Sequence, residues 1–251
     1  MHIAVCAKVV PDYEVPAADF ELVNGRAHER YTRMIGLYDE NAVEVGVQIK
    51  EKYSAQLTII SYGREDDIPV LRKAIAMGGD KLVLVIGSSD DPNMIAANLR
   101  MAIQQLGDVD LVLAGRQSAD MDRGVVPGIL AGMLGYTFIP QISQIENIDG
   151  NWKVNQITEK GSREMEFAGK GVISITDDTS NVPRIPPVRR ILAAKKMPVE
   201  KIPGIDTDPM PAEEISVEIP TIESVCEFLP VDDINQAAEM LLNKLKEERY
   251  L

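Results

Sequence analysis

Short apolar runs alternate with longer amphipathic stretches over the first 135 residues of the chain. The short runs are bounded by turn-forming residues, which predicts strands that are buried on both faces. These strands are expected at Ile3–Ala7, Leu57–Ile60, Leu82–Ile86 and Leu111–Ala114, with helices at 39–52 (Asp39 as N-cap), Ile68–Met77, Pro92–Leu106 and after Gly124. Because strands and helices alternate, we predict an α/β fold with a doubly wound, mostly parallel sheet.

The pattern changes after Gly135. Residues 144–154 and 164–168 surround turn signals at Asp149-Gly150 and Gly161, which predicts an antiparallel hairpin, and 171–176 reads as a further buried strand. Residues 189–196 form a basic helical stretch, and five prolines interrupt 198–220, which favours an extended C-terminal arm. An amphipathic helix closes the chain at 231–251. We therefore expect an α/β domain at 1–197 and an extended arm with a closing helix at 198–251.

The stretch 111–134 has the order strand, polar turn, helix. In a parallel sheet, ligands bind outside the carboxyl ends of the strands, and the free N–H groups at a helix start favour phosphate. An ordinary turn with solvated charges is the alternative that spacing leaves open. The first strand lacks a glycine-rich dinucleotide motif, a Walker A motif is absent, and two histidines are too few for a histidine-rich metal site.

Composition narrows the classes of partner and compartment. A formal net charge of −13 argues against nucleic acid and against an anionic membrane surface. Two cysteines, Cys6 and Cys226, suit a reducing compartment rather than a disulfide framework. Because no signal peptide and no membrane-spanning apolar run are visible, we expect a soluble cytoplasmic protein without membrane insertion.

Four stretches resemble the beta subunits of electron transfer flavoproteins, in the family's order and over nearly the whole chain. Residues 3–12 (IAVCAKVVPD) resemble the family's opening strand, and 38–44 (YDENAVE) its turn into an E-x-A-V/L-E helix. Residues 115–122 (GRQSADMD) are close to G-R/K-Q-A/S-x-D-x-D. Residues 181–184 (NVPR) and 191–196 (ILAAKK) resemble N-x-P-R followed by I-x-x-A-K/R-K. The resemblance implies an adenine-nucleotide alpha-hydrolase-like fold.

The resemblance also implies a heterodimer with an alpha subunit that carries the redox-active FAD, and a second nucleotide in this chain. That nucleotide is expected to contact Cys6, Gly36, Leu37, Tyr38, Asp39 and Tyr62, and chiefly Gly115, Arg116, Gln117, Ser118, Ala119, Asp120, Met121, Asp122, Arg123, Gly124, Val125 and Val126. Its phosphate would lie on backbone N–H groups at 123–126. No side chain is expected to be catalytic, because the flavins carry the redox chemistry.

AMP-binding members of the family place N-Q-T-G over the phosphate, whereas this chain has Gly124, Val125, Val126 and Pro127 there. Without side-chain hydroxyls this stretch leaves room beyond the first phosphate, and Arg123 is placed to neutralise a second. We therefore expect FAD in this chain, with AMP as the alternative. FAD would suit the electron-bifurcating type and its use of NADH, although the D-T-A-Q-V-G-P of many such members is matched only at Asp122 and Val126.

In the family, a loop in the 182–196 region recognises partner dehydrogenases, here an acyl-CoA or other flavin dehydrogenase. Val188 stands where the apolar anchor falls, and Arg189 and Arg190 supply the basic contacts. A solvated loop with a buried valine is the alternative, and the closing helix either docks on the alpha subunit or packs on its own domain. The competing function is a non-redox adenine-nucleotide-binding module. The arm and the lack of a glycine-rich pyrophosphatase loop argue against it.

Overall fold

The computed structural model describes residues 1–12, 14–16, 21–24, 26–27, 31–205, 226, 228–229 and 233–250. The chain divides into two compact units, Met1–Ile215 and Ser216–Leu251. None of the helices in the described part is long and apolar enough to cross a membrane.

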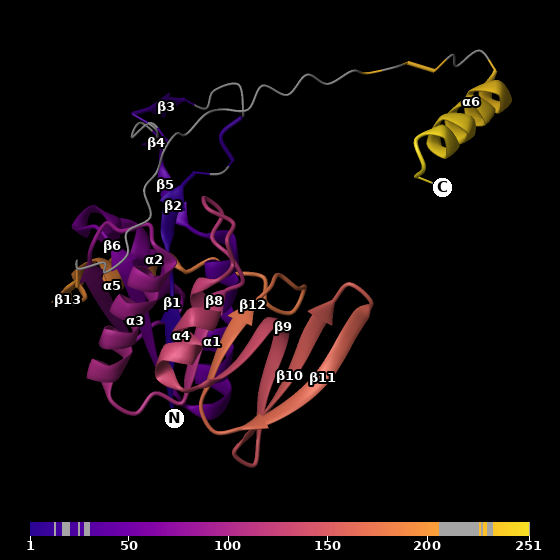
Figure 1. The fold of residues 1–251 in the computed structure, drawn as a ribbon. Helices are drawn as coiled ribbons and strands as arrows, with labels where there is room; N and C mark the ends of the chain where they lie inside the picture. The colour runs from indigo at the N-terminus through magenta and orange to yellow at the C-terminus, as the bar shows by residue number, and fades with distance from the viewer. Residues whose placement is uncertain are drawn as a thin grey trace. The chain divides into compact units, whose positions relative to one another are not determined.

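A nine-stranded sheet runs through the first unit in the order β11-β10-β9-β12-β8-β1-β6-β7-β13 (Figure 1). Its strands are β1 (His2–Cys6), β6 (Gln56–Gly63), β7 (Lys81–Ile86), β8 (Leu111–Gly115), β9 (Thr137–Ile148), β10 (Asn151–Thr158), β11 (Gly161–Ala168), β12 (Gly171–Ile175) and β13 (Val199–Pro203). Neighbouring strands are parallel from β9 to β13, and β10 and β11 are antiparallel. The predicted α/β class with a mostly parallel sheet is confirmed.

Helices cover both faces of the sheet (Figure 1). The helices are α1 (Leu37–Tyr53), α2 (Ile68–Met77), α3 (Pro92–Leu106), α4 (Val126–Leu134) and α5 (Val188–Lys196), with a short 3-10 turn at Glu65–Asp67. Successive side chains of a strand point to opposite faces. On β1, Ile3 and Val5 therefore join the core under α1 and α2, whereas Ala4 and Cys6 join the core under α3 and α4. The sheet is doubly wound.

The strand order reverses at β1. The chain passes from β1 to β6 and β7 on one side, and then returns to place β8 on the other side of β1. In open parallel sheets, ligands bind at the carboxyl ends of the two strands that flank such a switch point. The ends in question are Cys6 and Gly115, which are followed by a long connection to α1 and a shorter one to α4.

The long connection contains two small strand pairs. β2 (Val9–Pro11) pairs with β5 (Arg33–Ile35), and β3 (Leu22–Val23) pairs with β4 (Arg26–Ala27). Asn24 has a φ of 52°, which confirms the hairpin turn that Asn24-Gly25 predicts; Gly25 lies outside the described residues.

The antiparallel part is larger than the predicted hairpin. β9, β10 and β11 form a three-stranded meander with turns at Asp149-Gly150 and Gly161, the expected turn positions. β9 begins at Thr137 because its first half pairs with β12 in parallel and its second half with β10 in antiparallel fashion. One strand thus joins the parallel and the antiparallel parts of the sheet.

Two expectations about element ends are wrong. Helix α1 begins at Leu37 after Gly36, so Asp39 is not its N-cap. The expected arm from 198 opens with β13, which pairs with β7 at the sheet edge; 206–225 lie outside the described residues. In the second unit, α6 (Ile234–Glu247) begins after Asp233, whose carboxylate accepts hydrogen bonds from two backbone N–H groups as a predicted N-cap does.

Candidate functional site

Asp39 ties the ends of β1 and β8 to the start of α1. Its Oδ2 accepts a hydrogen bond from the Lys8 N–H at 2.9 Å, and its Oδ1 accepts one from the Gly115 N–H at 3.0 Å. Burial raises the pKa of this carboxyl group to about 7, against the lowering effect of the two N–H groups. The side chain that was expected to cap α1 therefore joins three elements at the switch point.

Gly115 is required where β8 meets α1. A Cβ atom at this position would lie 2.5 Å from Asp39 Oδ1 and 2.8 Å from the Asp39 nitrogen. A side chain would push the helix away and break the hydrogen bond that Asp39 accepts. The glycine that ends β8 thus sets the distance between the strand and the residues 36–39.

Arg116, the next residue, lies against Tyr38. Its guanidinium carbon is 4.4 Å from the centre of the Tyr38 ring, and its Nη2 donates to the Tyr38 hydroxyl at 2.6 Å. Its Nε is buried and has no hydrogen-bond partner among the described residues. The site therefore holds a fixed cation, which fits an anionic ligand.

Two polar pairs shape the turn that follows. Lys8 Nζ lies 2.7 Å from the carboxylate of Asp120, which brings the turn to the end of β1. Gln117 Nε2 donates to Asp122 Oδ1 at 2.5 Å, and the Asp122 N–H donates to the Ser118 carbonyl at 2.9 Å. Ala119 and Met121 complete the turn, and the Met121 side chain is exposed.

The backbone before α4 is arranged as an anion site. Asp122 and Gly124 have φ values of 55° and 63°, so the chain turns twice in the left-handed region. The N–H groups of 123–126 have no acceptor among the described residues, and the first hydrogen bond of the helix runs from Ile129 to Val125. Free N–H groups at a helix start bind phosphate. A Cβ atom at Gly124 would lie 3.2 Å from the Arg116 carbonyl oxygen.

Apolar surface accompanies these polar groups. Leu37, Met121 and Val125 are exposed large hydrophobic residues on the segments that surround the switch point. Cys6 is buried at the end of β1, where burial raises the pKa of its thiol to about 12 and keeps it neutral. An adenine or isoalloxazine ring needs such apolar surface beside the groups that hold its phosphates.

Tyr62 is linked to the turn before α4 by hydrogen bonds with the loop 87–91. Its hydroxyl accepts a hydrogen bond from the Ser89 N–H at 2.9 Å, and the next carbonyl, that of Asp90, accepts one from Arg123 Nη1 at 3.3 Å. The loop after β7 thus connects the end of β6 with the turn before α4. All the residues that the sequence predicts as nucleotide contacts lie at the carboxyl ends of the parallel strands or are linked to residues there.

The expected docking residues begin α5. Val188 is exposed rather than buried, and no described residue pairs with the Arg189 side chain. Arg190 differs, because its Nη1 donates to the carbonyl of Met77 at 3.0 Å. Its guanidinium stabilises the end of α2 as well as offering charge at the surface.

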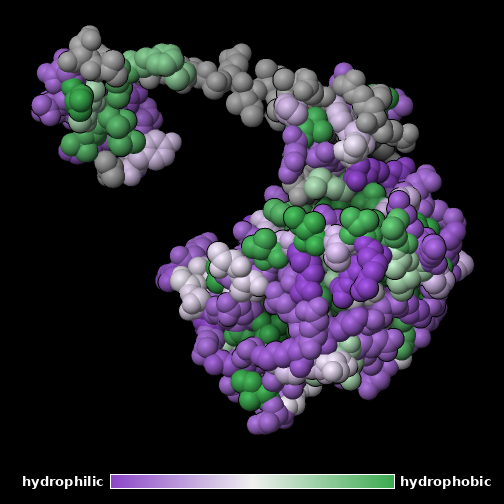
Figure 2. Space-filling view, turned by 180° about the vertical axis from the view of Figure 1, so that it is seen from behind, coloured by the Kyte–Doolittle hydropathy of each residue, from purple (hydrophilic) through white to green (hydrophobic). Residues whose placement is uncertain are grey.

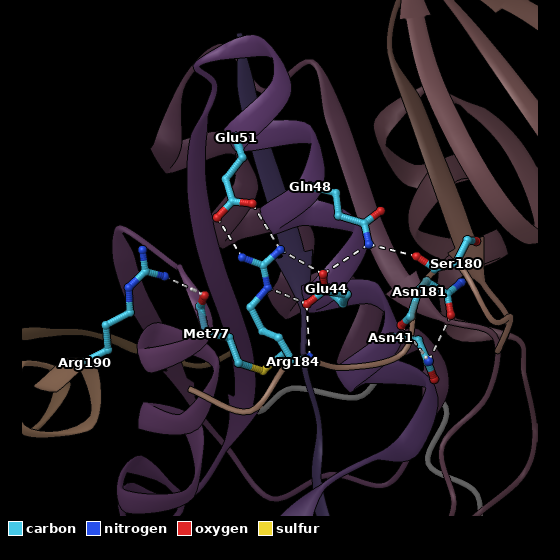
Figure 3. A network of polar contacts seen from close by, with 9 residues as sticks. All are labelled: Asn41, Glu44, Gln48, Glu51, Met77, Ser180, Asn181, Arg184 and Arg190. Atoms are coloured by element: carbon cyan, nitrogen blue, oxygen red, sulfur yellow. Dashed lines mark hydrogen bonds and ion pairs between the residues drawn. The ribbon is translucent and has the colours of Figure 1, made fainter. Parts of the chain in front are cut away.

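Sequence reasoning missed two groups of residues. Lys8 was not connected with Asp120, which is 112 positions away, although its place directly after the first strand was a signal. A polar network links α1 to the segment before α5, centred on Glu44 and Arg184 (Figure 3). Both residues stand inside the motifs that carry the family resemblance, but their charges were not matched.

These observations describe an α/β protein with a candidate ligand site at the switch point of a doubly wound sheet. Residues 27–206 match the electron transfer flavoprotein domain family. The chain is 30% identical over 260 residues to electron transfer flavoprotein subunit beta of Syntrophomonas wolfei, covering 99% of this chain and 98% of that protein. It is 30% identical over 270 residues to the Clostridium acetobutylicum subunit, and 28% identical over 264 residues to the probable Saccharomyces cerevisiae subunit.

The alignments cover both chains in full for the Clostridium acetobutylicum protein, and 100% of this chain and 98% of the relative for the Saccharomyces cerevisiae protein. The chain belongs to the family of electron transfer flavoprotein beta subunits. Membership assigns it to electron transfer and confirms the resemblance that the four motifs carry.

Proposed function

We propose that this chain is one half of a heterodimeric electron carrier and holds an adenine nucleotide at the carboxyl ends of β1 and β8. The observation that carries the proposal is the set of unpaired N–H groups at 123–126, in the turn that follows β8 at the topological switch point. The alpha subunit of such a heterodimer would supply the redox-active FAD.

Each part of the site has a role in this proposal. The N–H groups before α4 hold phosphate, and the Arg116 guanidinium, held against Tyr38, supplies positive charge beside them. Leu37 and Val125 supply apolar contact, while Asp39 and Gly115 fix the spacing. A bound flavin supplies one- and two-electron redox chemistry, and the protein supplies binding and orientation. The proposal assigns proton transfer to no residue of this chain.

We favour FAD over AMP in this chain. No side-chain hydroxyl stands at 124–127, and Gly124 permits close approach of the backbone. Arg123 is held beside the N–H groups through the Asp90 carbonyl, where it can face a second phosphate. With FAD in both subunits, the heterodimer would take part in flavin-based electron bifurcation with NADH; with AMP, this chain would be the structural half of a simple carrier.

The remaining surfaces are assigned to protein partners. Val188, Arg189 and Arg190 form the contact for an acyl-CoA or other flavin dehydrogenase, and α6 with the preceding arm docks on the alpha subunit. Supporting this, Val188 is exposed and α6 buries none of its side chains within its own unit. Cys6 and Cys226 are free thiols, which suits a reducing compartment, and we place the carrier in the cytoplasm.

The test is to produce the chain together with its alpha subunit, purify the complex and release its cofactors with acid. Chromatography with flavin absorbance then counts FAD and AMP per heterodimer. Two FAD support the bifurcating type, and one FAD with one AMP supports the simple carrier. A colourless preparation without a copurified partner would contradict the proposal.

A further inference from the structure

The segment Val182–Ala193 leaves several large apolar side chains exposed. Ile185 is 94% exposed and Val188 70% exposed, and Val182, Ile191 and Leu192 are also exposed. Within this stretch only Pro186 is buried. Hydrophobic burial fixes little of this stretch before α5 meets the core at Ala194, so polar contacts contribute to the conformation of the segment, which we call the docking segment.

Asn181 anchors the residue just before the docking segment. Its side chain is fully buried, and its Nδ2 donates to the carbonyls of Ser143 at 3.0 Å and Thr176 at 2.9 Å. Its Oδ1 accepts hydrogen bonds from Asn41 Nδ2 on α1 and from the Asp178 N–H, both at 3.0 Å. The chain therefore enters the docking segment from a defined point.

Arg184 makes the next connection, inside the segment itself (Figure 3). Its Nε and Nη2 donate to the two carboxylate oxygens of Glu44 at 2.8 and 2.9 Å, and its backbone N–H donates to the same carboxylate at 3.2 Å. Its Nη1 and Nη2 also donate to Glu51, about two helical turns further along α1, at 2.7 and 3.1 Å. One guanidinium thus spans two carboxylates on one face of α1.

Because Glu44 is buried, its charged carboxylate depends on the contact with Arg184. Only 5% of its side chain is exposed. Burial alone would raise the pKa of this carboxyl group, but hydrogen bonds from Arg184 and Gln48 outweigh burial and lower it. Gln48 donates to Glu44 at 3.1 Å and to the Ser180 carbonyl at 2.9 Å, so the second partner also reaches back to the same chain segment. A charged, desolvated carboxylate requires its arginine.

We propose that Arg184 is a positioning residue, which sets the docking segment in a partner-ready conformation by fixing its start to α1 through Glu44. The inference rests on the proposed function of Val188 and Arg189 in docking. Three prolines, Pro183, Pro186 and Pro187, limit the backbone around Arg184. The prolines restrict the backbone of the segment, and Arg184 fixes the orientation of the segment relative to α1.

Preorganisation explains why a chain would hold exposed apolar residues so firmly. A loose segment must be ordered when the partner binds, and the cost of ordering weakens the complex. If the docking conformation is only fractionally populated, the apparent affinity falls by the same fraction. Loss of Arg184 should therefore raise the KM for the carrier about tenfold and leave kcat nearly unchanged, because Arg184 does not touch the nucleotide site.

The experiment uses the purified heterodimer and an acyl-CoA dehydrogenase that reduces it. Hydrogen exchange of the amides at 185–193 and the KM and kcat for the carrier are measured for Arg184→Gln and Arg184→Lys. A double variant, Glu44→Gln with Arg184→Gln, leaves no unpaired buried charge and covers the case in which the single variant does not fold. The matched control is Lys52→Gln, which loses one charge and one α1 ion pair, with Glu146, away from the segment.

We expect Arg184→Gln and the double variant to exchange at 185–193 at least tenfold faster, with the higher KM, and Arg184→Lys to lie between them and the original protein. Lys52→Gln should match the original protein in both readouts. Unchanged exchange in the double variant would overturn the inference, as would faster exchange without a change of KM. A heterodimer that accepts electrons from no flavin dehydrogenase would instead overturn the proposed function, and the exchange data would still decide the role of Arg184 in positioning.

Discussion

Asp39 is a buried carboxyl group whose two oxygens serve two different strand ends. Burial favours its protonated form, and the N–H groups of Lys8 and Gly115 favour its charged form. Burial is the larger effect and raises its pKa to about 7 in the folded protein. The unfolded chain has the ordinary aspartate value of about 4. Between these two values, the folded protein keeps a proton that the unfolded chain has lost.

The first prediction follows from that proton. Because the folded pKa is the higher one, the stability that Asp39 contributes is present at pH 4 and is lost as the pH rises to about 7. The difference in unfolding free energy between the original protein and Asp39→Asn should fall by on the order of 3 kcal/mol over this range. Urea unfolding of both proteins at several pH values measures it. A difference that is constant, or grows with pH, would refute the assignment.

Arg189 and Arg190 are neighbours with different surroundings, so a second prediction compares them. Arg190→Met removes the hydrogen bond to the Met77 carbonyl and should lower the free energy of unfolding by about 1 kcal/mol. Arg189→Met should change it by less than about 0.5 kcal/mol. Thermal or urea unfolding of the two variants provides the comparison. Equal losses would mean that the Arg190 contact is not formed in solution.

The positions of the candidate site could be predicted from the sequence, but its internal pairs could not. From the motif 115–122 and the strand before it, the candidate residues were expected at the carboxyl ends of the parallel strands, where the structure has them. The ion pair of Lys8 with Asp120 and the hydrogen bond from Gly115 to Asp39 join residues 112 and 76 positions apart. Local pattern carries no information on such pairs, because they depend on which strands become neighbours.

At the scale of elements, the approach of β8 to α1 depends on one glycine. Gly115→Ala would place a methyl group 2.5 Å from Asp39 Oδ1, so strand and helix must move apart. We expect a loss of about 2 kcal/mol in unfolding free energy, as for an overpacked core. Gly132→Ala is the control, because it adds the same methyl group to α4 with nothing within 4 Å, and should be neutral or slightly stabilising. Denaturant unfolding distinguishes the two, and equal stability would refute the close approach.

Element boundaries were predictable where local signals and tertiary packing agree. Helix α3 was predicted at its observed bounds, and in the structure Asp91 caps its start and Gly107 follows its end. Helix α1 begins two residues before the expected cap, because Asp39 makes tertiary hydrogen bonds instead of a local one. Strand β13 was missed because it lies among prolines on the sheet edge, where its side chains are mixed and mostly exposed.

In the second unit, α6 has an apolar face that no described residue of the unit buries. Figure 2 shows hydrophobic side chains along one side of α6, and Leu241 and Leu242 are exposed. An acidic chain of net charge −13 with such a face fits a partner subunit better than a nucleic acid or an anionic membrane.

The corresponding prediction concerns assembly. Leu241→Glu should leave the circular dichroism and the thermal unfolding of the chain unchanged, because Leu241 is exposed in its own unit. It should weaken association with the alpha subunit about 30-fold, which corresponds to the burial of one leucine side chain. Asn243→Glu, which adds the same charge elsewhere on α6, should bind normally. Titration calorimetry measures both, and equal affinities would contradict docking through this face.

We propose that the backbone before α4 holds the phosphate of a nucleotide. The nucleotide content of Gly124→Glu tests this proposal most directly. Gly124 has a φ of 63° and its neighbours offer unpaired N–H groups, so a glutamate there adds both strain and a repelling charge. Gly132→Glu adds the same charge to α4 in open space. We predict that heterodimers with Gly124→Glu lose the nucleotide of this chain and keep the flavin of the alpha subunit, while Gly132→Glu keeps both. Full retention by Gly124→Glu would contradict the account.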